Sequence, residues 1–292
     1  MMQRTCQASF LAIAVLVGLI GNVCAADETF DLRGPAPKKG QSFKDTMKFS
    51  MKDAEVSIGL GDVKLEGKMD MTSIAEKEEE ILGVDGRNIT KLRTKLLKDD
   101  TTTKMAFAGM MQNDTKKKSL VGEIIFSELK DGKWKHVLED TKPSDEQAKE
   151  LKNFDNPEND DELFPAEKVK VGHAWDIEAK AFKKLFGSRV TDAKGTGKGK
   201  FLRTEKIGDD LCAVIEMDID LKAKMKEDEN EFDVEMKGKI ISFRSIADGL
   251  DVKFSINGTA KFDGTVNEDG MKAKLVFSGK MAGEGTAHFK KK

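Results

Sequence analysis

Apolar and polar residues alternate with a period of two along much of this chain. In residues 63–71 the odd positions are Val, Leu, Gly, Met and Met, while the even positions are Lys, Glu, Lys and Asp. The same alternation recurs in residues 211–221, 232–240, 250–258 and 271–279. Alternation of this kind predicts β-strands that have one apolar face and one polar face.

Short polar segments separate these strands and supply the Gly, Asn and Asp residues that tight turns need. They are residues 209–210, 226–230, 247–249 and 264–270. Sequential strands joined by short turns form an antiparallel meander, and its apolar face has to be buried. The sequence therefore predicts a mainly β fold, in which a meander forms a large curved sheet or an open barrel with one or two short helices.

Two segments carry helical signals. Residues 144–147 (Ser-Asp-Glu-Gln) form a capping pattern that opens a helix running to about Asn153. Residues 177–186 place Ile, Ala, Leu and Phe at helical spacing, and Gly187 follows as a C-cap. We expect both helices to pack against the sheet.

The first 26 residues have the pattern of a secretory signal peptide. Arg4 is the only charge, Phe10–Ile20 is an unbroken apolar run, and small residues end at Ala25 and Ala26. The run is shorter than the roughly 20 residues that a membrane-spanning helix needs. We therefore expect cleavage near Ala25 or Ala26, export to the periplasm or the extracellular space, and no permanent transmembrane anchor.

The remaining chain divides by composition into four parts. We expect a flexible lead-in at 27–39, a first β-rich half at 40–153, an acidic linker at 154–163 and a second β-rich half at 164–292. The two halves open alike, with Lys-Gly-Gln-Ser-Phe-Lys at 39–44 and Val-Gly-His-Ala-Trp-Asp at 171–176. An internal duplication is one hypothesis, and it leaves open whether the halves form one continuous sheet or two domains.

Charge and cysteine content narrow the class of protein. The formal net charge of −2 gives no field that would attract nucleic acid. Cys212 is the only cysteine beyond the signal segment and lies in an apolar strand, so we expect a buried thiol and no intramolecular disulfide.

The sequence offers few candidates for catalytic, metal-binding or phosphate-binding residues. His136, His173 and His288 lack the spacing of a metal site, and no Gly-x-Ser-x-Gly motif is present. The glycine-rich run at 195–200 lacks the Gly-Lys-Ser/Thr ending of a phosphate-binding loop, so we expect a strand relieved by glycines there. The sequence predicts no catalytic residue, no metal site, no cofactor and no enzymatic activity.

Methionine and phenylalanine are plentiful at the apolar positions of the strands. Met suits irregular cores and also lines adaptable apolar pockets, so core packing is the alternative to a ligand site. A curved sheet with this interior could hold a lipid-like molecule. The candidate ligand-binding residues on this apolar face are Met69, Met71, Met217, Met236, Phe254 and Phe277.

A mid-chain motif carries a resemblance to a known group. The pattern Phe164-Pro165, Val169, Gly172 and Trp175 resembles an element shared by uncharacterised secreted proteins of planctomycete-type bacteria. The resemblance implies no activity and no functional residues. The strand pattern is also similar to the half-barrels of envelope lipoprotein carriers of the LolA and LppX type, which implies a curved open sheet.

Three functions follow, in order of preference. The first is a non-enzymatic exported cell-envelope protein that binds an apolar, lipid-like ligand in a curved β-sheet. The alternative is a structural or interaction module that docks other envelope proteins. A hydrolase is the least favoured.

Overall fold

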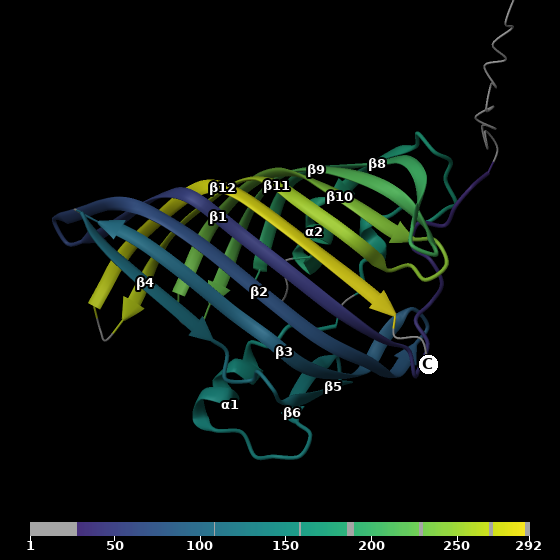
Figure 1. The fold of residues 1–292 in the computed structure, drawn as a ribbon, viewed down its shortest axis with the longest axis horizontal. Helices are drawn as coiled ribbons and strands as arrows, with labels where there is room; N and C mark the ends of the chain where they lie inside the picture. Colours follow the sequence, from purple (N-terminus) through teal and green to yellow (C-terminus); the bar gives the residue numbers. More distant parts are fainter. Residues whose placement is uncertain are drawn as a thin grey trace, which may run out of the picture.

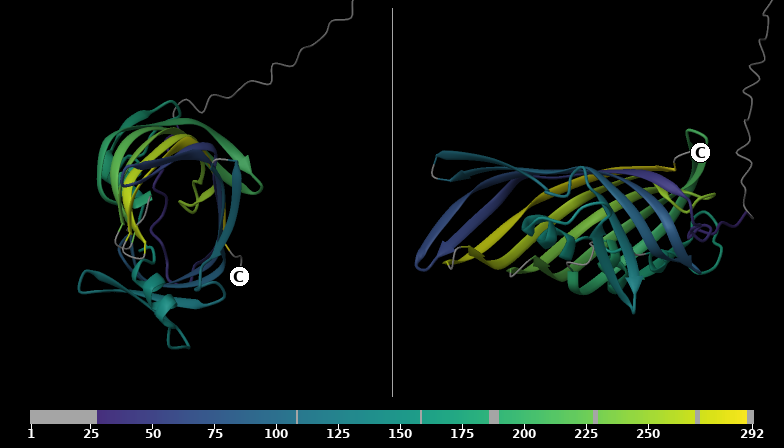
Figure 2. Two further views of the ribbon diagram at one scale, coloured as in Figure 1. Left: turned by 90° about the vertical axis from the view of Figure 1, so that its left-hand side faces the viewer. Right: turned by 90° about the horizontal axis from the view of Figure 1, so that it is seen from below.

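One antiparallel sheet of 12 strands makes up most of the molecule in a computed structural model (Figure 1). The structure describes residues 28–107, 109–157, 159–185, 190–227, 230–268 and 271–289. The signal segment 1–26 lies outside the described residues. Seen along its length, the sheet curls around its long axis (Figure 2). The prediction of a mainly β meander in a large curved sheet is confirmed.

The first half holds six strands, and the predicted alternating segment 63–71 is part of β2. The six strands are β1 (Ser42–Leu60), β2 (Val63–Asp85), β3 (Asn88–Phe107), β4 (Met110–Lys117), β5 (Ile124–Lys130) and β6 (Lys133–Leu138).

The second half holds the other six strands. They are β7 (Ala174–Glu178), β8 (Val190–Ile207), β9 (Asp210–Glu227), β10 (Asn230–Ser245), β11 (Asp251–Glu268) and β12 (Met271–Phe289). Helix α1 (Asp145–Lys152) and the 3-10 turn η1 (Asp161–Leu163) lie between the two sets of strands, and helix α2 (Ala179–Leu185) lies between β7 and β8.

Pairing between β1 and β12 joins the two sets into a single sheet. The strand order is β6-β5-β3-β2-β1-β12-β11-β10-β9-β8-β7, and β4 pairs with β3 beside that path. Within the described part of the chain, the edge strands β6 and β7 do not pair with each other. The sheet is therefore curved but open.

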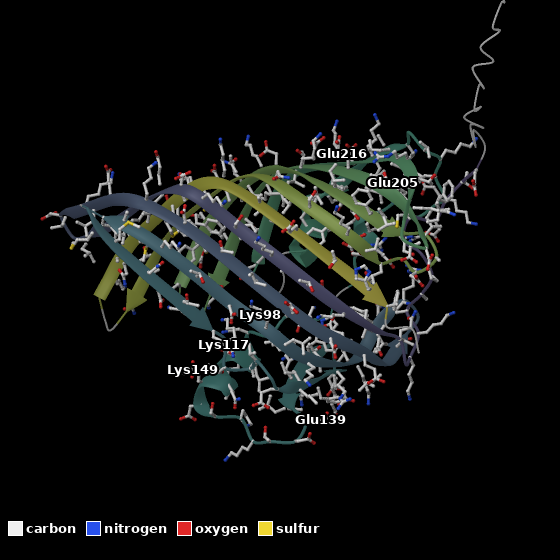
Figure 3. All side chains as sticks on the ribbon, in the orientation of Figure 1. Lys98, Lys117, Glu139, Lys149, Glu205 and Glu216 are labelled. Atoms are coloured by element: carbon white, nitrogen blue, oxygen red, sulfur yellow. The ribbon has the colours of Figure 1, made fainter. Side chains whose placement is uncertain are left out.

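The strand registers assign every alternating position to one of two faces. Met51 stands opposite Met71 in β2 and Met281 in β12, and the apolar positions of the other strands continue this row on the concave side, the inner face. The outer face carries charged residues that pair across strands, such as Lys222 with Glu235 at 2.9 Å. Figure 3 shows these charged side chains projecting from the sheet, including Glu205 and Glu216 on β8 and β9.

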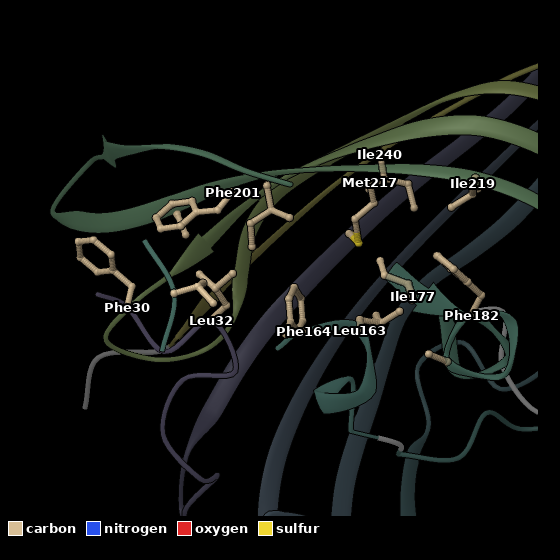
Figure 4. Close-up of a cluster of buried hydrophobic side chains, with 14 of the residues drawn as sticks. Phe30, Leu32, Leu163, Phe164, Ile177, Phe182, Phe201, Met217, Ile219 and Ile240 are labelled. Atoms are coloured by element: carbon tan, nitrogen blue, oxygen red, sulfur yellow. The ribbon is translucent and has the colours of Figure 1, made fainter. Parts of the chain in front are cut away.

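Part of the inner face is covered by the chain itself. We call residues 28–34 and 159–182 the plug, because their buried side chains, such as Phe30, Leu32 and Phe182, pack against the inner face of β8, β9 and β10 (Figure 4). Phe30 and Leu32 are buried there, although they belong to the segment 27–39 that was expected as a flexible lead-in. Phe30 also pairs with Val169 through backbone hydrogen bonds of 2.8 and 2.9 Å. These apolar residues lack a periodic pattern, which is why the sequence did not indicate their burial.

Arg244 fastens the plug to the sheet. Its guanidinium donates to the Asp160 carboxylate at 2.7 and 3.0 Å, to Asp251 at 3.1 Å and to the Leu32 carbonyl at 2.6 Å. It also lies 4.1 Å from the centre of the Phe164 ring. Burial alone lowers the pKa of Arg244, but the carboxylates of Asp160 and Asp251 outweigh it and raise the pKa. The guanidinium is therefore charged and fully paired.

A second arginine fastens the same segments from β2–β3. Arg87 donates to both carboxylate oxygens of Asp161 at 2.5 and 2.7 Å, and to the carbonyls of Gly34 and Arg33 at 2.9 and 3.1 Å. Asp160 and Asp161 of segment 154–163 thus have defined arginine partners.

The glycine-rich run at 195–200 is part of β8, as predicted. A Cβ atom on Gly199 would come within 2.2 Å of the Trp175 ring, and one on Gly197 within 2.3 Å of Phe182. The glycines therefore make room for the aromatic rings of the plug, which is a packing role.

The helix predictions are confirmed in one case and corrected in the other. Helix α1 begins at the predicted Ser144 cap, whose hydroxyl accepts from the Gln147 amide in a capping box. In the second case Ile177 lies in β7, because it pairs with Gly197 of β8, and α2 begins only at Ala179. Phe186 and Gly187, the expected end of that helix, lie outside the described residues.

The two similar opening segments have the same local structure. Gly40 and Gly172 both have positive φ (85° and 91°). The Gly40 amide donates to the Ile81 carbonyl in β2, and the Gly172 amide donates to the Phe201 carbonyl in β8, both at 2.7 Å. This correspondence agrees with the proposed alignment of the halves, and the duplication itself stays a prediction.

Replacing Arg244 with Met should lower the free energy of unfolding by about 3 kcal/mol, because buried carboxylates lose their partner. Urea unfolding of the full chain measures the change. Arg203→Met is the matched control, since the Arg203 pair with Glu205 is exposed and should contribute less than about 1 kcal/mol. Equal effects of the two substitutions would contradict the role given to Arg244.

Candidate functional site

The plug leaves a second part of the inner face without a cover. We call it the open apolar face, and its buried centre is Met51, Ala54, Val56, Met69, Ala260 and Met281. Larger side chains surround this centre and are only partly buried, among them Phe49, Met71, Met105, Met236, Phe262 and Phe277. Apolar side chains that stay partly accessible on a concave surface are typical of ligand sites.

All six candidate ligand-binding residues lie on the inner face, as the strand registers show. Met71, Met236 and Phe277 are partly buried at the open apolar face, and Met69 is buried within it. Phe254 is half-buried and packs over Gly285. Met217 differs, because it is buried beneath the plug, so the structure separates it from the others.

A cavity of about 700 Å³ lies between the inner face of β1, β2 and β3 and the segment that includes α1 and residues 153–157. Its apolar wall consists of Phe43, Met47, Ala75, Ile89, Leu92, Leu96, Leu120 and Phe154. Its volume is within the range of small-molecule sites in proteins.

The cavity and the open apolar face are continuous along β1. The inner positions of this strand run from Phe43 through Met47, which lines the cavity, to Phe49 and Met51, which belong to the open apolar face. Met47 is 47% exposed, although it points to the inner side. A long apolar molecule could therefore contact both regions at once.

Charged groups meet inside the cavity. The Lys77 ammonium lies 3.1 Å from Glu79 and 3.9 Å from Asp45, and these three residues project from the inner face of β1 and β2. Glu79 also accepts from the buried Thr94 hydroxyl at 3.2 Å. We call Lys77, Asp45, Glu79 and the nearby Asp155 the Lys77 cluster. Its position at the end of an apolar cavity makes it the most unusual charged group of the inner face.

The cluster changes the protonation of its members. Burial lowers the pKa of Lys77, but the carboxylates of Glu79 and Asp45 outweigh burial and raise it. Burial raises the pKa of Asp45 and outweighs the opposing effect of Lys77. Lys77 is thus held as a cation, whereas the Asp45 carboxylate is not fully compensated. Groups with such perturbed pKa values are enriched at functional sites.

A larger depression of about 880 Å³ lies mainly on the outer face of the neighbouring strands β1, β12, β11 and β10. Glycines 258 and 279 leave its floor low, and its sides are lysine, glutamate and serine side chains. Those charged side chains already pair across strands, as Lys237 does with Asp220 at 2.8 Å. Most of its lining is charged or polar, with Ala260 and Met281 as the buried apolar part.

Ser127, His136 and Asn156 form a hydrogen-bonded chain that resembles a nucleophile with its base. Ser127 Oγ lies 2.8 Å from His136 Nδ1, and His136 Nε2 lies 3.2 Å from Asn156 Oδ1. Burial lowers the pKa of His136, which favours the neutral ring. Ser127 is fully buried between β3 and β6, so no substrate reaches its hydroxyl in this structure. The chain of hydrogen bonds satisfies buried polar groups.

The structure also shows where the other residues discussed in the sequence analysis lie. His173 stacks on Trp175, whose indole donates to the Leu163 carbonyl at 2.8 Å. Cys212 is buried as predicted, and burial raises the pKa of its thiol to about 11. Among the described residues, no group of three or more His, Cys, Asp or Glu side chains is arranged to hold a metal ion. No helix in the described ranges is both long enough and apolar enough to cross a membrane.

The Lys77 cluster is absent from the sequence-based candidates, although a signal for it exists. In β1 the inner positions are Phe43, Asp45, Met47 and Phe49, so a carboxylate interrupts an apolar row. In β2 a lysine and a glutamate occupy the inner positions 77 and 79. A charged residue at an apolar position of a strand has to find a partner, and this pattern marks the site.

Comparison with known proteins adds little at the level of sequence. No protein-family model matches the chain, and no curated protein matches it. Among solved structures, it is similar to a DUF1329 family protein from Desulfovibrio piger, with 10% identity, a TM-score of 0.18, and coverage of 86% of this chain and 85% of the other. The COG4313 outer membrane channel from Pseudomonas putida matches with 9% identity, a TM-score of 0.21, and coverage of 87% and 97%. Scores this low do not establish a shared fold.

Replacing Asp45 with Asn should raise the stability of the protein near neutral pH. The folded state binds the Asp45 proton more tightly than the unfolded state, so this group's contribution to stability falls as pH rises from the unfolded pKa through the raised folded pKa. Asn resembles the protonated acid and avoids this loss.

Urea unfolding at about pH 4 and about pH 7.5 measures the effect, because the ordinary pKa of Asp is about 3.9. The variant should have the higher midpoint at the higher pH, and the difference should shrink at the lower pH. A variant that is less stable than the wild type at both pH values would contradict the position of Asp45 described here.

Proposed function

We propose that this chain is a non-enzymatic, exported cell-envelope protein that binds an apolar, lipid-like ligand on the inner face of its sheet. The observation that carries the proposal is the open apolar face together with the cavity that continues it. The signal-peptide pattern of residues 1–26 supports export.

The physical argument rests on the cost of leaving apolar surface in water. The plug buries much of the inner face of β8, β9 and β10, whereas Phe49, Met71 and Phe277 on β1, β2 and β12 are only partly buried on the same side. Each square ångström of apolar surface removed from water stabilises by roughly 25 cal/mol. An apolar ligand would therefore gain free energy by completing the cover that the plug begins.

The side chains at the open apolar face suit a ligand of variable shape. Met side chains are flexible and polarizable, so they adapt to an irregular guest. The rings of Phe262 and Phe277 stack with centroids 4.5 Å apart and add a flat apolar surface. This combination favours an alkyl or acyl chain over a rigid polar substrate.

Filling the cavity should weaken ligand binding without unfolding the sheet. Ala75 lines the cavity, and Ala75→Trp should raise the dissociation constant for the neutral dye Nile red by about tenfold or more. Fluorescence titration of the purified full chain measures it, and circular dichroism checks the fold.

Ile74→Trp is the control for that experiment, because position 74 is adjacent but belongs to the outer face. It should leave the affinity unchanged. A wild-type protein that does not bind Nile red saturably, or equal effects of the two substitutions, would remove the basis of the proposal.

A second candidate function has one specific observation in its favour. Met110 and Met111, at the turn between β3 and β4, are 73% and 76% exposed, and Val63 at the neighbouring β1–β2 turn is 58% exposed. Exposed apolar residues gathered at hairpin tips are typical of contact surfaces. In this interpretation the chain is an interaction module that docks another envelope protein.

The double substitution Met110→Gln and Met111→Gln separates the two candidates. Pull-down from an envelope extract should lose its partner if the tips are the docking surface, while Nile red binding stays unchanged. If Nile red binding and pull-down are both unaffected, the interaction hypothesis through these tips is wrong.

A further inference from the structure

We propose that the cavity recognises the head group of an amphiphile, and that this head group is cationic, with the Lys77 cluster as its binding site. The inference rests on the proposed function and adds the chemical class of the ligand. It depends on a charge imbalance inside the cavity and on the continuity between the cavity and the open apolar face.

The charge imbalance is local. The Lys77 cluster contains three carboxylates, those of Asp45, Glu79 and Asp155, and a single ammonium group. The other charged groups that line the cavity balance one another: Asp99, Glu146, Glu150, Lys116, Lys118 and Lys149. The cluster therefore supplies the cavity's formal excess of two negative charges, beside the apolar side chains of Phe43, Met47 and Ala75.

The contacts within the cluster show which carboxylate can accept a further hydrogen bond. Glu79 is 8% exposed and already accepts from Thr94 at 3.2 Å and from Lys77 at 3.1 Å. Asp45 lies farther from Lys77, at 3.9 Å, and 30% of its side chain is accessible. Asp45 is also one of the residues that line the cavity. Asp45 is thus the carboxylate best placed to receive a donor from a ligand.

An isolated buried charge is costly, and its cost falls when an opposite charge is brought to it. In the empty cavity, a proton on Asp45 reduces the imbalance. An ammonium group of a ligand would reduce it as well, and it would also donate hydrogen bonds to Asp45. A carboxylate or phosphate would instead add a negative charge beside three others, so the cluster disfavours an anionic head group.

The position of the cluster also orients the ligand. Phe43, Met47, Ala75 and Leu96 lie around it in the cavity, and the inner positions of β1 lead from there to Phe49 and Met51. A head group at Asp45 would place an attached alkyl chain along this row toward the open apolar face. The charged site and the apolar surface therefore form one binding site for a single amphiphilic molecule.

Three amphiphiles with twelve carbon atoms each test the inference: dodecylammonium, dodecanol and dodecanoate. The experiment measures how strongly each amphiphile displaces Nile red from the purified full chain, at concentrations below the aggregation threshold of that amphiphile. The ammonium form should bind about tenfold more tightly than the carboxylate, with the alcohol between them. Dodecanoate binding as tightly as dodecylammonium, or more tightly, would overturn the inference.

Two variants assign the preference to the cluster. Asp45→Asn and Glu79→Gln should each reduce the ammonium preference to about threefold or less. Glu284→Gln is the matched control, because it removes one negative charge from an outer-face position whose side chain is 70% exposed. The control should keep the full preference. An unchanged preference in Asp45→Asn and Glu79→Gln would show that the cluster does not recognise the head group.

The outcomes also separate this inference from the proposed function. If Nile red binds but none of the three amphiphiles displaces it, the head-group inference is wrong while an apolar site remains. If Nile red itself does not bind, the proposed function fails and the inference fails with it.

Discussion

The need to shield one face of a very long antiparallel sheet from water governs the rest of this structure. Twelve strands with strict alternation produce an inner face that is apolar over most of its area. The chain covers β8, β9 and β10 with its plug, which Arg244 and Arg87 fasten through carboxylates and backbone carbonyls. Among the described residues, the plug's buried side chains belong to the cluster under β8, β9 and β10 and not to that of the open apolar face, and this asymmetry is the basis for the proposed ligand site.

Charged groups on the inner face also have to be shielded or paired. They occur at Arg244 and at the Lys77 cluster, and their roles differ. Arg244 is 2% exposed and donates to Asp160 and the Leu32 carbonyl of the plug and to Asp251 of β11, so its role is to hold these segments together. The Lys77 cluster faces a cavity, and burial raises the pKa of its Asp45 rather than an ion pair lowering it. A buried charge whose hydrogen bonds are all satisfied is typical of a structural role, whereas an incompletely compensated charge in a cavity is typical of a ligand-binding role.

The alternation of residues was sufficient to predict the strands, the antiparallel meander and the inner position of all six candidate residues, because side-chain direction has a period of two in any strand. It could not show that Met217 lies beneath the plug, since that contact joins parts of the chain far apart in sequence. The packing of Phe30 and Leu32 escaped prediction for the same reason. The Lys77 cluster was detectable in principle, because Asp45, Lys77 and Glu79 interrupt apolar rows, but strand pairing was needed to bring the three residues together.

The central claim is that the inner face holds a ligand. Native mass spectrometry of the full chain isolated from the envelope of its own cells, followed by lipid extraction, tests it most directly. The account predicts a stoichiometric mass above that of the polypeptide, which disappears on extraction and belongs to an amphiphile with an alkyl chain. A protein that carries the mass of the polypeptide alone, and that takes up no lipid when envelope lipids are added back, would contradict it.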